Sequence, residues 1–224
     1  MDGRELEMEL VVSDDGSHTI RIPSLKEHYH SHKGAIQECA HVFIKMGLEQ
    51  FPEDASLRIF EMGFGTGLNV LMTAINARSR SIYYKSIEAF PLDRDMISRL
   101  NYPAQIGTSE AIRLFGDIHD ANWQLDVKLI ENFVLHKQHT GLQELESETG
   151  FDLIYYDAFA PHAQPELWTM DVWNKLFEMM NPGGILVTYC AKGQVRRDLQ
   201  SAGFDVERLP GPPGKREMLR AQKA

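Results

Sequence analysis

The distribution of apolar residues along the chain predicts alternating strands and helices. Short, almost continuous apolar runs are typical of buried strands, whereas apolar residues three or four positions apart are typical of helices with one buried face. Five strands are expected, at residues 57–62, 81–88, 133–139, 151–156 and 183–190. Helices are expected at residues 68–75, 91–100, 140–145, 165–180 and 195–202. This alternation predicts an open, mostly parallel α/β sheet.

Segments at both ends of the chain follow other patterns. Residues 7–23 alternate apolar and polar on both sides of Asp14–Ser17, which predicts a β-hairpin. Apolar residues at helical spacing predict a helix over 34–48, leading into the core. Residues 204–210 and 215–222 are expected to form a closing antiparallel pair. We therefore divide the chain into an N-terminal extension, 1–50, and a main domain, 51–224.

Residues 101–132 give the weakest pattern. Tyr102-Pro103 interrupts the chain, and a helix that ends near Leu114 is expected after it. Residues 116–132 then form either an insertion or a poorly packed hairpin.

A glycine-rich turn follows the first predicted strand of the main domain. In the stretch Leu57–Asn69, an apolar run ends in Gly63, Gly65 and Gly67, and a helical pattern begins directly afterwards. Open α/β sheets bind nucleotide-like ligands at such turns, where glycines allow a close approach to the backbone. The G-x-G-x-G spacing excludes a P-loop and fits a dinucleotide fingerprint poorly. With Glu61, the turn suits a ligand with an amino acid head and a nucleoside tail, and S-adenosylmethionine is the candidate.

Two acidic residues stand at the ends of later strands. Glu88 lies twenty-one residues after Gly67, about where an acidic residue accepts hydrogen bonds from ribose hydroxyls in nucleoside-binding sheets. Asp157 ends the fourth strand, which should adjoin the first, so it is expected to face the same crevice as the glycines.

Composition and charge narrow the class of protein. The chain of 224 residues is 43% apolar, and its two cysteines, Cys39 and Cys190, form no C-x-x-C motif. Without a leader or a long apolar run, we expect a reduced, cytoplasmic protein that contacts no membrane. His28, His30 and His32 lack a fourth ligand, so no metal is expected, and a polar pocket wall or plain surface is the better interpretation.

The net charge of −9 is unevenly distributed. Residues 192–224 contain eight Lys or Arg against four Asp or Glu, so this tail is about +4 and the rest about −13. A locally basic face on an acidic protein is compatible with a specific nucleic-acid site, although a solvated charged surface explains it equally well.

Several motifs together resemble one family. GFGTGLN, YKSIEAFPL, YYDAFAP followed by PELWT, NPGGILVTY and GPPGKREML are similar to the methyltransferase half of the bifunctional MnmC family, over about residues 29–219. With no second dinucleotide fingerprint, the chain resembles a stand-alone member, of the MnmD type. Asp157-Ala158 stands where the family has Asp-Gly, and Gln138-His139 aligns with a Gly-Asp that would face adenine.

The resemblance implies a Rossmann-like class I S-adenosylmethionine-dependent methyltransferase with a seven-stranded, mostly parallel sheet and a small N-terminal β-hairpin. The implied reaction transfers a methyl group to the amine of 5-aminomethyl(-2-thio)uridine at the wobble position of the tRNA anticodon loop. The catalytic candidates are Asp157, which would bind and align the amine, and Phe159 and Pro161, which would enclose it. The cofactor-binding candidates are Glu61, Gly63, Gly65, Gly67, Asn69, Glu88, His139 and Thr140, with Gln143 as an alternative adenine contact. The RNA-binding candidates are Lys192, Arg196, Arg197, Lys215 and Arg216.

Other functions fit the same pattern. An aminopropyltransferase or a small-amine N-methyltransferase would use the same sheet, the glycines, Glu88 and Asp157. A non-catalytic RNA-binding domain that kept the fold is a further alternative. The sequence leaves the oligomeric state open.

Overall fold

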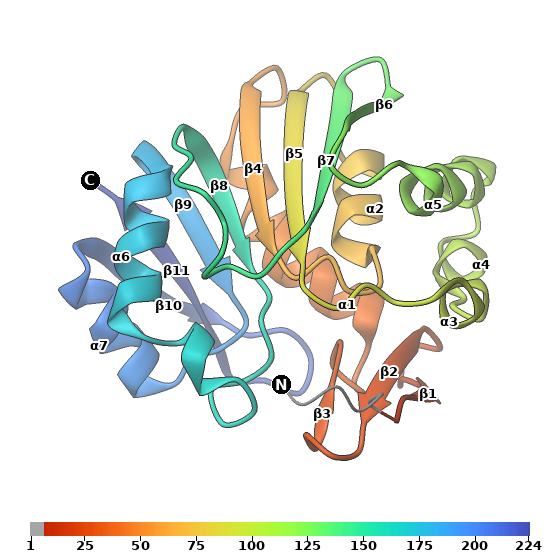
Figure 1. Cartoon of the computed structure of the whole chain (residues 1–224), viewed down its shortest axis with the longest axis horizontal. Coiled ribbons are helices and arrows are strands. Elements are labelled where there is room, and N and C mark those ends of the chain that lie inside the picture. Colours follow the sequence, from red (N-terminus) through yellow and green to blue (C-terminus); the bar gives the residue numbers. More distant parts are fainter. Residues whose placement is uncertain (1–6) are drawn as a thin grey trace.

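The computed structural model describes residues 7–224, which form two β-sheets and the helices that cover the larger one (Figure 1). The eight-stranded sheet has the order β10-β11-β9-β8-β4-β5-β7-β6. Its parallel strands are β4 (Ser56–Met62), β5 (Ser81–Glu88), β7 (Phe133–His139), β8 (Phe151–Tyr156) and β9 (Met180–Thr188). Antiparallel strands complete it: β6 (Asp126–Ile130), β10 (Phe204–Pro210) and β11 (Glu217–Lys223).

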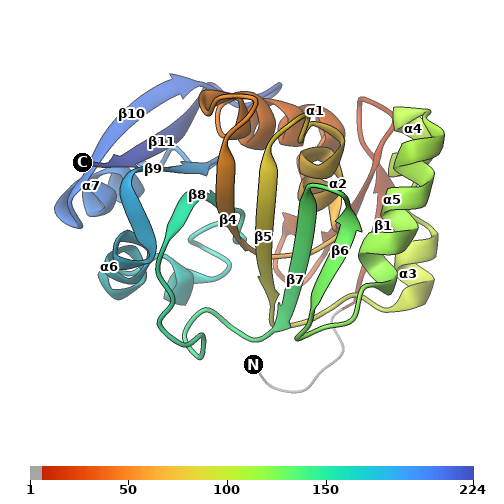
Figure 2. The same cartoon turned by 90° about the horizontal axis from the view of Figure 1, so that it is seen from above.

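Helices cover both faces of this sheet (Figure 2). One face carries α1 (Ala35–Cys39) with the π-helix η1 (Ala40–Lys45), then the 3₁₀ turn η2 (Leu48–Gln50), α2 (Leu68–Ile75) and the three helices α3 (Arg94–Ser98), α4 (Tyr102–Ile106) and α5 (Ser109–Asp120). The other face carries the 3₁₀ turn η3 (Pro165–Leu167), α6 (Met170–Met179) and α7 (Gly193–Ser201).

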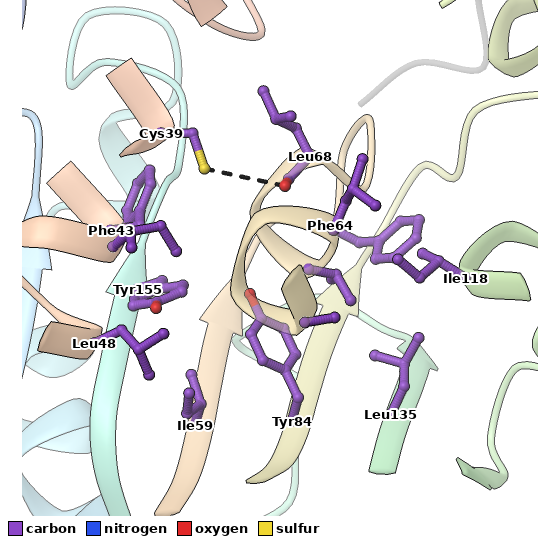
Figure 3. Packing of buried hydrophobic residues seen from close by; sticks show 14 of the residues in the cluster. Cys39, Phe43, Leu48, Ile59, Phe64, Leu68, Tyr84, Ile118, Leu135 and Tyr155 are labelled. Carbon is purple, nitrogen blue, oxygen red and sulfur yellow. Dashed lines mark hydrogen bonds between the residues drawn. The ribbon is translucent and has the colours of Figure 1, made fainter. Parts of the chain in front are cut away.

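Each sheet face has its own hydrophobic core because side chains alternate along a strand. On β8, Tyr155 belongs to the core under α2, and its neighbour Tyr156 belongs to the core under α6. Figure 3 shows the first core, where Phe43 and Tyr155 pack with ring centroids 5.0 Å apart. The Cys39 thiol there lies 4.0 Å from the carbonyl oxygen of Leu68, at the start of α2. This packing fixes α2 and the turn before it against the strands.

The N-terminal hairpin is confirmed and gains a third strand. β1 (Glu9–Val12) pairs with β2 (His18–Ile22), and β2 pairs with β3 (Glu27–His28). This small sheet lies at the carboxyl ends of the parallel strands (Figure 1). The division of the chain near residue 50 stays a prediction.

The fold class is confirmed, but the sheet has eight strands instead of seven. The additional strand, β6, lies within residues 116–132 and pairs antiparallel with β7. Helix α5, capped by the Thr108 hydroxyl, extends to Asp120, well beyond the predicted end near Leu114.

Several other predicted boundaries are wrong. No regular helix forms at 140–145, where a single turn is closed by the Leu145 N–H donating to the Gly141 carbonyl oxygen. The ammonium group of Lys175 donates to the carbonyl oxygens of Leu142 and Leu145. The helix expected from Pro91 begins only after Asp93, whose carboxylate caps α3. The helix expected from Pro165 is a 3₁₀ turn followed by α6, and the predicted 34–48 helix changes to π-helix after Cys39.

Within residues 7–224, no helix has the length and apolar character needed to cross a membrane. The same residues contain no cluster of three or more His, Cys, Asp or Glu arranged to hold a metal ion. Both cysteines are buried free thiols.

Candidate functional site

The glycine-rich turn connects β4 to α2 and closely approaches two other segments. Gly63, Gly65 and Gly67 have φ values of +93°, +50° and +72°, a region in which side chains are rarely accommodated. A Cβ at Gly63 would lie 3.2 Å from the carbonyl oxygen of Asp157, and one at Gly65 would lie 3.1 Å from the Tyr29 ring. The turn therefore needs glycine at these positions, because a side chain would strain the backbone and crowd the neighbouring segments.

Replacing Gly67 with alanine is expected to destabilise the protein by about 1–2 kcal/mol, since the new side chain would sit at φ +72°. The added Cβ would also lie 3.1 Å from Nε2 of His119. Gly116→Ala is the matched control, because the position lies in α5 and nothing lies within 4 Å of the added Cβ. There the free energy of unfolding is expected to increase by about 0.5–1 kcal/mol. Urea unfolding of both variants measures the difference, and equal effects would contradict the assigned role of the turn.

A cavity of about 490 Å³ lies between the turn, the ends of β5, β7 and β8, and the small N-terminal sheet. Its lining includes these candidates predicted from sequence: Gly63, Gly65, Asn69, Glu88, His139, Thr140, Gln143, Asp157 and Phe159. The other candidates, Glu61, Gly67, Pro161 and the five basic residues, are outside the lining. None of the residues from 7 to 224 that line the cavity is a lysine or arginine, whereas four are Asp or Glu. The cavity therefore favours a cationic ligand.

Glu88 is held at one end of the cavity by two backbone amides. One carboxylate oxygen accepts a hydrogen bond from the Gly65 N–H at 3.0 Å, and the other from the Phe90 N–H at 2.9 Å. A carboxylate has about four lone-pair sites, so acceptor positions remain for the hydroxyls of a ribose. His139 and Thr140 lie beside this end, where Nε2 of His139 is 3.2 Å from the carbonyl oxygen of Ala89.

Asp157 lies at the opposite side of the turn, in the loop after β8. Its Oδ2 atom accepts a hydrogen bond of 2.9 Å from the side-chain amide of Asn69 in α2. Burial and the nearby carboxylate of Glu38 raise the pKa of Asp157 to about 7, although Asn69 and Lys215 act to lower it. A carboxyl group that titrates near neutral pH is suited to accept a proton from a substrate.

Aromatic side chains stand beside Asp157. The rings of Tyr29 and Phe159 meet edge to face, with centroids 5.2 Å apart. The indole N–H of Trp168 donates to the carbonyl oxygen of Phe159 at 2.8 Å, which fixes the loop after β8. Both rings line the cavity together with Asp157, and burial together with the nearby Glu88 carboxylate raises the pKa of the Tyr29 hydroxyl.

The N-terminal segment also supplies site residues, and of these only His30 lies among the residues interpreted from the sequence as a polar pocket wall or plain surface. Ile22, Leu25, Tyr29 and His30 line the cavity, and Nε2 of His30 is 2.9 Å from the Thr66 hydroxyl in the glycine-rich turn. Burial lowers the pKa of His30 to about 4, so the imidazole is neutral. The spacing of His28, His30 and His32 was the available signal, and a polar pocket wall was one of its interpretations.

The predicted basic residues lie around α7 and the β10–β11 loop. Lys192 immediately precedes α7, and Arg196 and Arg197 lie on it. In the loop, Lys215 forms an ion pair of 2.6 Å with Glu38 and lies 3.7 Å from the centroid of the Tyr189 ring, whereas Arg216 is exposed. Lys215 therefore links this loop to α1 beside the cavity.

Comparisons with known proteins agree with this geometry. Residues 114–224 match a family described as S-adenosyl-L-methionine-dependent methyltransferase. A "tRNA 5-methylaminomethyl-2-thiouridine biosynthesis bifunctional protein MnmC" from Cupriavidus metallidurans is 32% identical, over 96% of this chain and 34% of that protein. The chain thus spans about a third of the length of the curated relatives it matches.

Among solved structures, MnmC2 from Aquifex aeolicus has a TM-score of 0.79 and 25% identity, over 98% of this chain and 72% of that one. Spermidine synthase from Thermotoga maritima shares the fold at 12% identity, with a TM-score of 0.53, over 97% of this chain and 74% of that one.

The cofactor of this family fits the cavity. S-adenosylmethionine combines a nucleoside, a positively charged sulfonium and an amino acid. The cavity lining includes Glu88 and Asp157 and, among the described residues, no lysine or arginine. Gly63, Gly65 and Asn69 lie between these two carboxyl groups. Residues 114–224 thus match the S-adenosyl-L-methionine-dependent methyltransferase family, and the chain is similar to the MnmC proteins over almost its whole length.

Proposed function

We propose that the protein methylates the primary amine of 5-aminomethyluridine or its 2-thio form, at the wobble position of tRNA. The name of the MnmC relatives supports this substrate, since their product carries a methylaminomethyl group. The observation that carries the proposal is the carboxyl group of Asp157, placed beside an aromatic wall at the cofactor cavity. A tRNA substrate also implies a cytoplasmic location.

An amine acceptor presents a specific chemical problem. An alkylamine with a pKa near 10 is only about one part in a thousand neutral at pH 7, which costs about 4 kcal/mol. The methyl donor, when bound, supplies an electrophilic methyl group that only the neutral amine can attack. A carboxylate beside the amine can accept a hydrogen bond from its N–H group, aim the nitrogen lone pair at the methyl group and take up the released proton.

Asp157 has the geometry for this role. Asn69 occupies its Oδ2 atom, and no hydrogen bond to Oδ1 is formed by residues 7–224, so Oδ1 is available to the amine. We assign Tyr29 and Phe159 to the walls of the amine's pocket, where their rings exclude water and strengthen the interaction with the carboxylate. We place the ribose hydroxyls of the cofactor at Glu88 and its adenine near His139 and Thr140.

Methyl transfer from tritiated S-adenosylmethionine tests the proposal. The substrate is bulk tRNA from cells that lack this gene, and nucleoside digestion with mass spectrometry identifies the product. Tritium in 5-methylaminomethyl(-2-thio)uridine is the expected result. Transfer to free small amines instead, or aminopropyl transfer from the decarboxylated donor, would overturn the tRNA assignment. Cofactor binding without any transfer would favour a non-catalytic RNA-binding protein.

The basic residues on α7 are proposed to contact tRNA phosphates. Replacing Arg196 and Arg197 together with alanine is expected to weaken tRNA binding and to reduce the slope of log affinity against log salt by about 2, one for each lost contact. Affinity measured over a salt series checks this. Arg113→Ala is the control because Arg113 lies on α5 and pairs with Asp117 at 2.6 Å. An unchanged slope in the double variant would show that these two arginines do not contact tRNA phosphates.

A further inference from the structure

The ammonium group of Lys215, in the β10–β11 loop, makes two contacts within the protein. It forms an ion pair of 2.6 Å with Oε2 of Glu38 in α1 and lies 3.7 Å from the centroid of the Tyr189 ring, directly after β9. The Glu38 side chain is only 5% exposed, and its other oxygen accepts a hydrogen bond of 3.0 Å from the Ser31 N–H. Because a buried carboxylate without its counterion destabilises a protein, this ion pair holds Lys215 in place.

The backbone of the β10–β11 loop is fixed as well. The N–H group of Lys215 donates to the carbonyl oxygen of Pro212 at 2.9 Å. Gly214 has a φ of +83°, and a Cβ at this position would lie 2.5 Å from Cγ of Lys33 in the N-terminal segment. The loop is therefore a tight turn that packs closely against the N-terminal segment and directs the Lys215 side chain toward α1.

Tyr189 connects the Lys215 side chain to the loop that contains Asp157. Its hydroxyl donates a hydrogen bond of 2.9 Å to the carbonyl oxygen of Ala158, a buried residue directly after Asp157. Burial and the Asp157 carboxylate raise the pKa of Tyr189, so the hydroxyl keeps the proton that it donates. The indole N–H of Trp168 holds the next carbonyl oxygen, that of Phe159. Two aromatic donors thus fix consecutive residues of the loop after β8.

We propose that Lys215 and Tyr189 are positioning residues for methyl transfer: Lys215 orients the Tyr189 ring, and the Tyr189 hydroxyl fixes the backbone next to Asp157. An ammonium group over an aromatic ring restrains that ring by a cation–π interaction. The placement of the carboxylate matters because a shift of about 1 Å in a catalytic group can lower a rate about a hundredfold. The inference rests on the proposed role of Asp157 in accepting the amine.

This role separates Lys215 from the other basic residues that were predicted to bind RNA. If its ammonium group moved to a tRNA phosphate, the Glu38 carboxylate would remain buried without a counterion, at a high energetic cost. Loss of Lys215 is therefore expected to affect the rate of methyl transfer and not the affinity for tRNA.

Two variants each remove one of the contacts. Lys215→Met keeps the length of the side chain without its charge, and Tyr189→Phe keeps the ring without its hydroxyl. Each is expected to lower the single-turnover rate of methyl transfer by a factor of about 10–100. Lys215→Arg is expected to stay within about threefold of the wild type, since a guanidinium group can pair with Glu38 and stack on the ring. Thermal melting monitors folding, and Tyr189→Phe, which changes no charge, tests the proposal even if Lys215→Met unfolds.

Lys128→Met and Tyr83→Phe are the matched controls, because they make the same chemical changes at residues outside the cavity lining. Lys128 forms an ion pair of 2.8 Å with Glu131, and the Tyr83 hydroxyl donates to Asp126 at 3.2 Å. Both controls are expected to keep the wild-type rate. A loss as large as that in Lys215→Met and Tyr189→Phe would overturn the assignment.

Two further measurements separate positioning of Asp157 from other roles. Adding Lys215→Met or Tyr189→Phe to Asp157→Asn is expected to change the rate by less than about twofold, because the contribution of the carboxylate is already absent. The slope of log tRNA affinity against log salt is expected to stay the same in Lys215→Met, whereas loss of a phosphate contact would reduce it by about 1. A full additional loss of rate in the double variants, or a reduced slope with an intact single-turnover rate, would contradict the inference.

Amide hydrogen exchange gives a readout that does not depend on activity. Peptides that cover residues 157–161 are expected to exchange about tenfold faster in Lys215→Met and Tyr189→Phe, while peptides from β4 keep the wild-type rate, because only the loop has lost its support. Unchanged exchange in the loop would overturn the inference. If the tRNA assay shows no transfer while the loop exchanges faster in both variants, the proposed function fails and the fixing of the loop by Lys215 and Tyr189 stands.

Discussion

Replacing Asp157 with asparagine is expected to lower kcat by a factor of about 10²–10⁴, the usual contribution of a positioned general acid or base. Asparagine keeps the size of the side chain but can neither accept the released proton nor attract the protonated amine. The affinity for S-adenosylmethionine is expected to change little, since Glu88 and the backbone of the glycine-rich turn, which we assign to cofactor binding, are unchanged in the variant. Single-turnover kinetics and equilibrium titration separate the two quantities.

Asp198→Asn is the matched control for Asp157→Asn. Asp198 lies on the surface of α7 and accepts a hydrogen bond from Gln194, so its loss should leave kcat unchanged. The wild-type kcat/KM is further expected to fall below about pH 7, because burial raises the pKa of Asp157 to about 7 and the protonated group cannot accept the amine proton. Intact turnover together with a large loss of cofactor affinity would contradict this role.

The second large effect is expected in the pH dependence of the free energy of unfolding, which should differ between the wild type and Glu61→Gln. Burial raises the pKa of Glu61 from an ordinary 4.5 to about 8 in the folded protein, so the folded state binds the proton more tightly than the unfolded state. This group therefore leaves the folding free energy unaffected below pH 4.5 and destabilises the protein progressively as pH rises from 4.5 to 8. The loss is on the order of 4 kcal/mol across that window.

Glutamine carries no titratable proton, so the variant lacks this loss. Urea unfolding of both proteins from pH 5 to pH 8.5 is expected to show the wild type losing stability relative to Glu61→Gln by that amount. All other groups are common to the two proteins and cancel in the comparison, apart from the influence of Glu61 on Asp157. Parallel stability curves would show that Glu61 has an ordinary pKa in the folded state.

The sequence predicted the parallel strands and the glycine-rich turn because their signals are local. A buried strand such as β8 is apolar throughout, and the three glycines occupy positions where the backbone demands them. The placement of Asp157 and Glu88 in one cavity was predictable for the same reason, since the ends of parallel strands meet at one edge of a sheet.

The missed features depend on partners that are distant in the sequence. The segment expected to be a helix at 140–145 is a single hydrogen-bonded turn, and its Leu142 and Leu145 carbonyl oxygens accept hydrogen bonds from Lys175, some thirty residues later. The contact of His30 with Thr66 joins the N-terminal segment to the glycine-rich turn over 36 residues. Such contacts leave no periodic pattern in either segment, so the spacing of the histidines suggested a polar pocket wall but not the contact of His30 with Thr66.

The pairing of β4 with β8 at the centre of the large sheet has a consequence for folding during synthesis. The Arg58 amide donates to Asp152, 94 residues further along the chain. Pairing across such a separation has a high entropic cost and forms slowly. Because synthesis runs from the N-terminus, the glycine-rich turn leaves the ribosome well before Asp157. The two halves of the site then meet only when β8 pairs with β4 at the centre of the sheet. Methyl transfer by nascent chains would thus report completion of the sheet, whereas local structure at the turn would not.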